Sequence, residues 1–342
     1  WGDYDRDGHV DLYVGRASGD DAEPTGPIVD RLFRNLGNGE FQTSALLAFL
    51  PMTSTTSASW ADATGDGELD LFIGAGRAGE SSLLLVQSVT QTPLLDYEHS
   101  FAVDSTRLPT SPSTLDEIRS VSWRDLNSDG ALDLLLGGST SGENGTRVLW
   151  NDGAGFFTST SVIAGGFASK GQVAVDLDLD GHVDVVAAPA SSAVQPGVFE
   201  NEGNGATPSF VDRSAFAGMA SSSADIRAIV AADLAGPSST ADGDEDVYLG
   251  RLQSTGAFFY QNVSSGTDVP ANKWLRVELD RGDRANNELG IGALVTVTTT
   301  LPDASTLDQV QIVDGGSGAG SQAASGLTFG LGNTATGAEV SV

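Results

Sequence analysis

Four short segments of the chain place an oxygen-bearing side chain at every second position, in the pattern D-x-(D/T/N)-x-D-G-x-x-D. Carboxylates at alternate positions of a tight loop can converge on one point, and the glycine lets the chain turn sharply by adopting positive φ. Carboxylates that lie so close repel one another unless a cation neutralises them. Several hard oxygen ligands suit Ca²⁺, whereas Mg²⁺ requires a stricter octahedron and retains its waters. The pattern therefore predicts four calcium-binding loops.

Positions 1, 3, 5 and 9 of each loop would bind calcium through side chains, and position 7 through its carbonyl, because position 7 is His, Glu or Ala. The predicted ligands of loops one to four are Asp3, Asp5, Asp7, His9 and Asp11; Asp62, Thr64, Asp66, Glu68 and Asp70; Asp125, Asn127, Asp129, Ala131 and Asp133; and Asp176, Asp178, Asp180, His182 and Asp184. In a fifth copy an insertion separates the first Asp from the rest, so we expect weak or no binding there. Its candidate ligands are Asp233, Asp242, Asp244 and Asp246.

Two simpler interpretations compete with a functional calcium site. In the first, the Asp-Gly pairs are ordinary β-turns with solvated acids, but four copies that each lead into a hydrophobic strand argue against it. In the second, the calcium is structural, tying two strands together across a loop and stabilising the folded state alone. We expect the second.

The loops recur at a spacing that suits one repeated structural unit. Their first Asp falls at positions 3, 62, 125, 176 and 233. Most copies are followed by a second element, an apolar strand with an Asn-Gly-type turn and another strand, at 32–41, 148–157 and 198–210, with a weaker trace at 258–262. Four short strands in each unit, with turn residues between them, are typical of one blade of a β-propeller. No stretch has the period of a helix.

The repeats end near residue 262, and a different segment follows Pro270. Alternating apolar residues in WLRVEL and ALVTVTT predict further strands, and the glycines predict tight corners. We therefore expect two domains, a β-propeller over 1–270 and a small β-domain over 271–342.

The composition excludes several classes of partner. Seventeen basic residues against 46 acidic ones give a formal net charge of -29, which opposes binding to nucleic acid and to anionic membranes. There is no Cys, so disulfides, thiolate metal sites and Cys nucleophiles are ruled out. No apolar run approaches the roughly 18 residues of a membrane helix. The chain begins at Trp1 without a signal-like segment, and we expect a trimmed or mature product that is secreted or held at the cell surface.

The residues do not predict an enzyme. Two of the three histidines, His9 and His182, fall at the carbonyl-ligand position of a loop, and His99 falls in a predicted outer strand as an exposed surface residue. There is no Gly-x-Ser-x-Gly elbow, no His-Glu-x-x-His and no phosphate-binding loop. The alternative is a polysaccharide-active propeller enzyme, because abundant acids supply many carboxylate pairs. Two glycosylation sequons start at Asn144 and Asn262.

The repeated D-x-D-x-D-G-x-x-D-L core resembles the FG-GAP/VCBS repeat, the calcium-loop blade of integrin α-subunit propellers and many bacterial surface proteins, over roughly 1–262. The last segment resembles the ASPIC/UnbV domain, which follows such repeats in the cartilage acidic protein family. The matching stretches are Trp274-Leu-Arg-Val, Gly290-Ile-Gly-Ala, Gly316-Gly-Ser-Gly, Ser321-Gln322 and Phe329-Gly-Leu-Gly332. The family's closing Trp-Pro-x-Gly is not present, so we expect a shortened domain.

The resemblance implies an all-β fold, a propeller of FG-GAP/VCBS blades, five of them recognisable, with a small C-terminal β-domain. It also implies adhesion and matrix or surface binding outside the cell. Because the residues predict no enzyme, we expect this role to be non-catalytic, and the strands missing from the first and last blades leave open edges that could recruit other copies for surface assembly. The expected partner is an extracellular protein, a glycan, or further copies of the chain joined head to tail as a filament. Nucleic acid and membrane insertion are not expected.

Overall fold

The computed structural model describes most of the chain. The residues it does not describe are 18–28, 51–53, 78, 93–96, 110–114, 116, 139–144, 164–166, 192–193, 204–205, 216–225, 235–242, 252–256, 263–271, 280–286, 288–289, 317–320 and 324–325. The described residues form strands, turns and bends but no helix, which confirms the all-β prediction. Among them, no helix that could cross a membrane is found.

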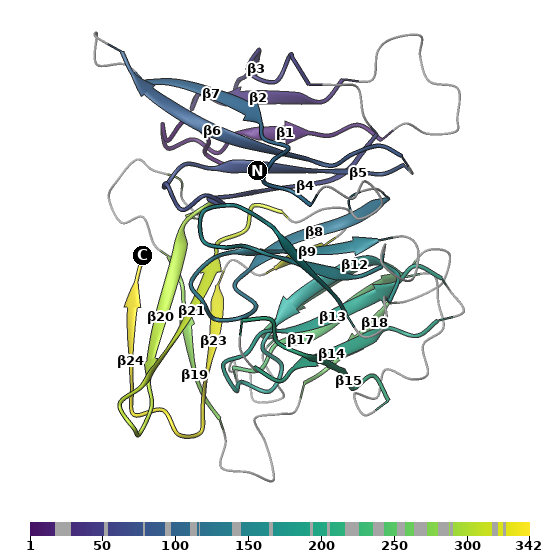
Figure 1. Ribbon diagram of the computed structural model, residues 1–342, viewed down its shortest axis with the longest axis vertical. Helices are drawn as coiled ribbons and strands as arrows, with labels where there is room; N and C mark the ends of the chain where they lie inside the picture. Colours follow the sequence, from purple (N-terminus) through teal and green to yellow (C-terminus); the bar gives the residue numbers. More distant parts are fainter. Residues whose placement is uncertain are drawn as a thin grey trace.

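The repeats fold into a series of antiparallel sheets, which we call blades one to five (Figure 1). Blade one has β1 (Leu12–Val14), β2 (Arg31–Asn35) and β3 (Phe41–Ser44). Blade two has β4 (Thr55–Ala61), β5 (Asp70–Ala75), β6 (Leu83–Gln91) and β7 (Tyr97–Val103). Blade three has β8 (Ile118–Arg124), β9 (Asp133–Gly138), β10 (Arg147–Trp150) and β11 (Ser159–Val162). Blade four has β12 (Ser169–Val175), β13 (Asp184–Pro189), β14 (Gly197–Asn201) and β15 (Phe210–Asp212), and blade five has β16 (Ile226–Ala232), β17 (Asp246–Arg251) and β18 (Phe258–Tyr260).

The strands follow the predicted order within each unit. In blades two to five the first strand runs into the acidic loop, and the second strand leaves that loop and pairs back along the first. The first strands β4, β8, β12 and β16 pack side by side, so the sheets fan out from a shared inner edge in a propeller-like arrangement (Figure 1). In blade one, an isolated bridge between Gly2 and Asp11 stands where the other blades have this first strand.

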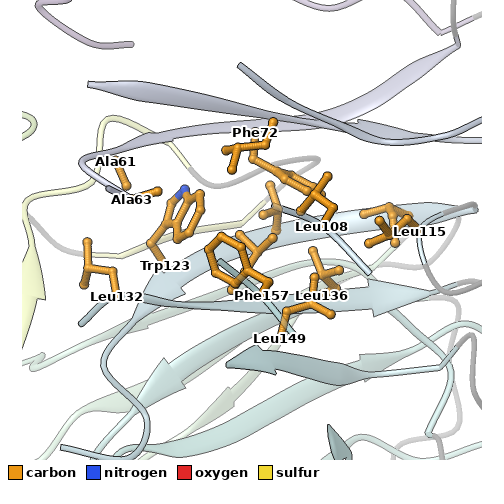
Figure 2. Packing of buried hydrophobic residues seen from close by; sticks show 14 of the residues in the cluster. Ala61, Ala63, Phe72, Leu108, Leu115, Trp123, Leu132, Leu136, Leu149 and Phe157 are labelled. Carbon is orange, nitrogen blue, oxygen red and sulfur yellow. The ribbon is translucent and has the colours of Figure 1, made fainter. Parts of the chain in front are cut away.

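The core lies between the blades. Because side chains alternate along a strand, the second strand of a blade sends one set of residues to each neighbour. Between blades two and three, the Trp123 ring packs against Phe72 and Phe157, at centroid distances of 6.5 and 5.9 Å (Figure 2). Aliphatic residues of both blades surround these rings and are buried. Apolar packing of sheet on sheet therefore joins each blade to the next.

Blade one is open on the side away from blade two. Val14 stands three residues after the last Asp of its loop and is 39% exposed. The residues at the same point in blades two to five are Ile73, Leu136, Ala187 and Leu249, and they are at most 2% exposed because a preceding blade covers them. Trp1 and Phe41 are also about half exposed and lie against each other, with ring centroids 6.4 Å apart.

The C-terminal segment forms a smaller β-structure beside the blades (Figure 1, lime to yellow). Its strands are β19 (Lys273–Val277), β20 (Leu294–Thr300), β21 (Thr306–Ile312), β22 (Ser321–Ala323), β23 (Leu327–Gly332) and β24 (Gly337–Ser341). They form the pair β19-β23 and the sheet β21-β20-β24, around a core that includes Val295 and Phe329. The strands predicted in WLRVEL and ALVTVTT are present as β19 and β20.

One strand of this segment belongs to a blade. β22 pairs in parallel with β16 and thereby supplies a fourth strand to the sheet of blade five. The segment also reaches the inner edge of blade three, where Arg124 Nη1 donates to the Ile312 carbonyl at 3.5 Å. The C-terminal domain is therefore joined to the blades by strand pairing as well as by side chains.

Candidate metal loops

The first Asp of every acidic loop closes the loop on itself. Its carboxylate accepts the N–H of the loop glycine, at 3.1 Å for Asp3–Gly8, 2.8 Å for Asp62–Gly67, 3.0 Å for Asp125–Gly130 and 2.9 Å for Asp176–Gly181. Each of these glycines has a φ between 86° and 100°, which confirms the predicted need for positive φ at this position. The loops thus hold their first carboxylate facing inward before any ion binds.

The last Asp of every loop is buried and joins the loop to its blade through two hydrogen bonds. One carboxylate oxygen accepts the N–H of loop position 2, as in Leu126 to Asp133 at 3.0 Å. The other accepts the N–H of the residue two positions after the third strand stops pairing with the second strand, as in Asn151 to Asp133 at 2.9 Å. The same pair of bonds recurs at Asp11, Asp70 and Asp184.

In two loops the carboxylates converge as predicted. Ligand oxygens of Asp3, Asp5 and Asp11 in loop one all lie within 4.8 Å of one another, and so do those of Asp176, Asp178 and Asp184 in loop four. Asp3 Oδ1 is buried and has no hydrogen-bond partner. Hard carboxylate oxygens at this separation, one of them unpaired, fit a Ca²⁺ ion.

Loop position 5 does not join these groups. Asp180 Oδ1 accepts the His182 N–H at 2.8 Å, and Asp7 Oδ1 accepts the His9 N–H at 3.0 Å. In loop one, Arg34 also forms ion pairs with both Asp5 and Asp7. Loop four has no such arginine among the described residues, so its charges depend more on a bound ion.

Loops two and three gather fewer acids because position 3 is Thr64 or Asn127. No group of three acidic residues forms there among the described residues. Thr64 Oγ1 is nevertheless buried without a hydrogen-bond partner, which fits a role as an oxygen ligand of a cation. Asn127 instead donates its amide to Asp129 and to the Ala206 carbonyl.

The two histidines at loop position 7 pack their rings against a neighbouring turn. The His9 ring lies over Gly37 and the His182 ring over Gly203, both in the Asn-Gly-type turn of the same blade. A Cβ on either glycine would lie within 2.3 Å of the ring, so these turns require glycine. Both histidine side chains thus point away from the loop interior.

Burial raises the pKa of the loop carboxyls. The pKa reaches about 6 at Asp3, about 7 at Asp125 and about 8 at Asp133, in each case chiefly because burial disfavours the charged form. Neighbouring carboxylates add to the shift, for example Asp7 at Asp3. In loop four, burial raises the pKa of Asp176 and Asp184 well above the ordinary value. Such groups take up a divalent cation in exchange for protons.

A row of amide side chains ties each loop to the next blade, and we did not predict it. An Asn or Gln, two residues after the third strand stops pairing with the second strand, donates to the carbonyl at loop position 2 of the preceding blade. The bonds are Gln87 to Tyr4 at 2.8 Å, Asn151 to Ala63 at 2.9 Å, Asn201 to Leu126 at 2.8 Å and Asn262 to Leu177 at 2.7 Å. The available signal was the Asn that ends VLWN, VFEN and FYQN, which was predicted only as part of the turn; blade two has Gln87 instead, and Asn35 of LFRN donates to Val10 of its own blade.

We expect Asn201→Ala to lower the melting temperature by roughly 3–6 °C, because it leaves buried carbonyls of Leu126 and Val183 without a donor. The matched control is Asn38→Ala, since Asn38 is exposed and bonds only to Glu40 in its own turn. Equal shifts for the two variants in thermal unfolding would contradict an inter-blade role.

The remaining predicted residues have mixed outcomes. Asp242 and Asn144 lie outside the described residues. The Asn262 amide nitrogen, which would carry a glycan, donates to the Leu177 carbonyl, so the folded chain disfavours glycosylation there. His99 is on the outer strand β7 as predicted, but it is partly buried and not the exposed surface residue that we expected. It is half-buried between blades one and two, with Nδ1 2.8 Å from Gln87 Nε2 and its ring edge-on to Tyr4.

Comparison with protein families agrees with this geometry. The FG-GAP-like repeat model matches residues 3–73 and 125–187, which contain loops one to four. The ASPIC and UnbV model matches residues 282–342. A search of curated proteins found no match. The fifth loop lies outside both matches, as its departure from the pattern would suggest.

Proposed function

We propose that this chain, which carries FG-GAP-like repeats followed by an ASPIC and UnbV domain, is a calcium-stabilised, non-catalytic binding protein that works outside the cell. The observation that carries the proposal is the convergence of three carboxylates at the same point of the repeat in loops one and four. In loops two and three, the first and last Asp keep the same hydrogen bonds, and a Thr or Asn oxygen replaces one charge.

The calcium is structural in this proposal. Each ion would fix the loop that joins the first two strands of a blade. The amide side chains that donate to loop position 2 would then connect the fixed loop to the neighbouring blade. Asp3, Asp5 and Asp11 would hold the ion in loop one, and Asp176, Asp178 and Asp184 would hold it in loop four. The ion supplies positive charge and coordination, and the fan of blades presents the surface that binds the partner.

Isothermal titration with Ca²⁺ tests the site, and we expect about four bound ions for each chain. Binding to glycan arrays and to immobilised extracellular proteins, in calcium and in EDTA, tests the function. The expected result is binding that EDTA abolishes, without turnover of any glycan. Hydrolysis of a polysaccharide would replace this proposal with the propeller-enzyme alternative.

Assembly of copies is one form of the same proposal. Sedimentation velocity in millimolar Ca²⁺ over a wide concentration range distinguishes it from binding to another molecule. Large particles that fall apart on chelation would identify further copies as the partner, and a monodisperse monomer would exclude them.

A further inference from the structure

The fifth loop keeps both ends of the pattern that the other loops share. Asp233 Oδ2 accepts the Gly243 N–H at 3.2 Å, and Gly243 has a φ of 90°. Asp246 Oδ1 accepts the Asn262 N–H at 2.7 Å. The Asp233 side chain is fully buried, and its Oδ1 has no hydrogen-bond partner. A buried carboxylate of this kind needs a compensating positive charge.

The C-terminal domain supplies a positive charge at that point. Arg276 lies on β19, and its Nη1 is 3.7 Å from Asp233 Oδ2. Arg276 and the buried Arg124 also interact electrostatically with Glu245, which lies within the same loop. A cation held this close to Asp233 would repel a Ca²⁺ ion that approached the same carboxylate.

The same strand covers the loop glycine. The Trp274 ring lies over Gly243 so closely that a Cβ there would be 2.1 Å from Cε2 of the indole. The equivalent Gly130 of loop three has the same φ of 90° and has nothing within 4 Å of a built Cβ. The domain also binds loop four, where the Gly332 N–H donates to the Leu179 carbonyl at 2.9 Å and Asn272 donates to the Asp178 carbonyl at 2.7 Å.

We propose that the described part of the fifth loop, residues 233–234 and 243–246, is the docking site of the C-terminal domain, with Arg276 supplying the positive charge that an ion supplies in the other loops. The insertion that separates Asp233 from the rest of the pattern is then tolerated, because this loop does not need to bind a metal ion. Docking at blade five is calcium-independent, whereas the other four loops depend on calcium. The contrast with loops one to four rests on the proposed function, in which those loops bind calcium.

Paired variants test the proposal by thermal unfolding in Ca²⁺ and in EDTA. Asp233→Asn should lower the melting temperature by a similar amount in both, roughly 3–6 °C. The matched control is Asp125→Asn, the first Asp of loop three, which should lower it in Ca²⁺ and hardly change it in EDTA. A calcium-dependent effect of Asp233→Asn would overturn the proposal.

A double-mutant cycle separates this proposal from the proposed function. Asp233→Asn and Arg276→Gln should be strongly non-additive in EDTA, because each removes one side of the Asp233–Arg276 ion pair, while Arg276 keeps its ion pair with the exposed Glu278 at 3.0 Å. Additive effects would overturn the docking proposal whatever the result for Asp125→Asn. If Asp125→Asn is also calcium-independent while the cycle shows coupling, the calcium function fails and the docking proposal holds.

A glycine pair gives a second readout that does not depend on charge. Gly243→Ala and Gly130→Ala impose the same backbone strain, but only Gly243→Ala displaces Trp274. Hydrogen–deuterium exchange in β19 should therefore speed up roughly tenfold or more for Gly243→Ala and stay unchanged for Gly130→Ala. Equal exchange in β19 for the two variants would show that this contact does not hold the domain in place.

Discussion

In EDTA the chain should unfold at a temperature roughly 10 °C or more below its melting temperature in millimolar Ca²⁺. A ligand that binds only the folded state stabilises it by about 2.7 kcal/mol for each site when its concentration is 100 times Kd. Loops one to four carry fourteen aspartates at the side-chain ligand positions, four in each of loops one and four and three in each of the others. Without ions, the first and last carboxylates of each loop repel one another at buried or partly buried positions.

Loop four should contribute most to the difference between the melting temperatures in Ca²⁺ and in EDTA. Its first and last Asp are buried, and no described arginine neutralises it as Arg34 neutralises loop one. We expect Asp178→Asn to lower the melting temperature in Ca²⁺ by roughly 5 °C, the loss of about one site. In EDTA the same variant should be neutral or slightly stabilising, because it removes one of four repelling charges.

The control for charge removal is Asp152→Asn. Asp152 is exposed in the hairpin turn of blade three and accepts the N–H groups of Ala154 and Phe156, which an Asn oxygen can also accept. It should change neither melting curve. Identical curves for the parent chain with and without EDTA would refute structural calcium at these loops.

Much of the fold could be predicted because each unit is local. The loop pattern fixes a turn through the first Asp and the glycine, and alternation of apolar residues identifies the strands on either side. Blade two shows this well: β4 ends at Ala61, one residue before the first Asp of the loop, and β5 begins at the last Asp, Asp70. Four repetitions made a coincidence improbable.

The contacts between units could not be predicted, because they join residues far apart in the chain. Asn201 reaches Leu126 in the preceding blade, and the three-residue strand β22 pairs with β16 from nearly a hundred residues away. Position 5 of the loops stays a prediction. Its carboxylate accepts a nearby N–H, as Asp180 does from His182, and its oxygens are not among those that converge in loops one and four.

The stabilisation by calcium should grow as the pH rises from about 5.5 to 8.5. Without an ion, burial raises the pKa of Asp3 to about 6, of Asp11, Asp70 and Asp125 to about 7, and of Asp133 to about 8. In the unfolded chain these groups titrate near 3.9. Because the folded pKa is the higher one, their protonation favours the folded state. That contribution is complete below about pH 4 and is lost as the pH rises through 6 to 8.

Calcium reverses this trend because it binds the ionised carboxylates and displaces their protons. The melting temperature in EDTA should therefore fall across this range, while that in saturating Ca²⁺ stays nearly level. Titration calorimetry at pH 7 in buffers of different ionisation enthalpy should show protons released on binding. Asp133→Asn, which removes the group with the highest of these values, should flatten the fall in EDTA. A gap between the two melting curves that stays constant from pH 5.5 to 8.5 would contradict the assignment of these buried carboxyls as calcium ligands.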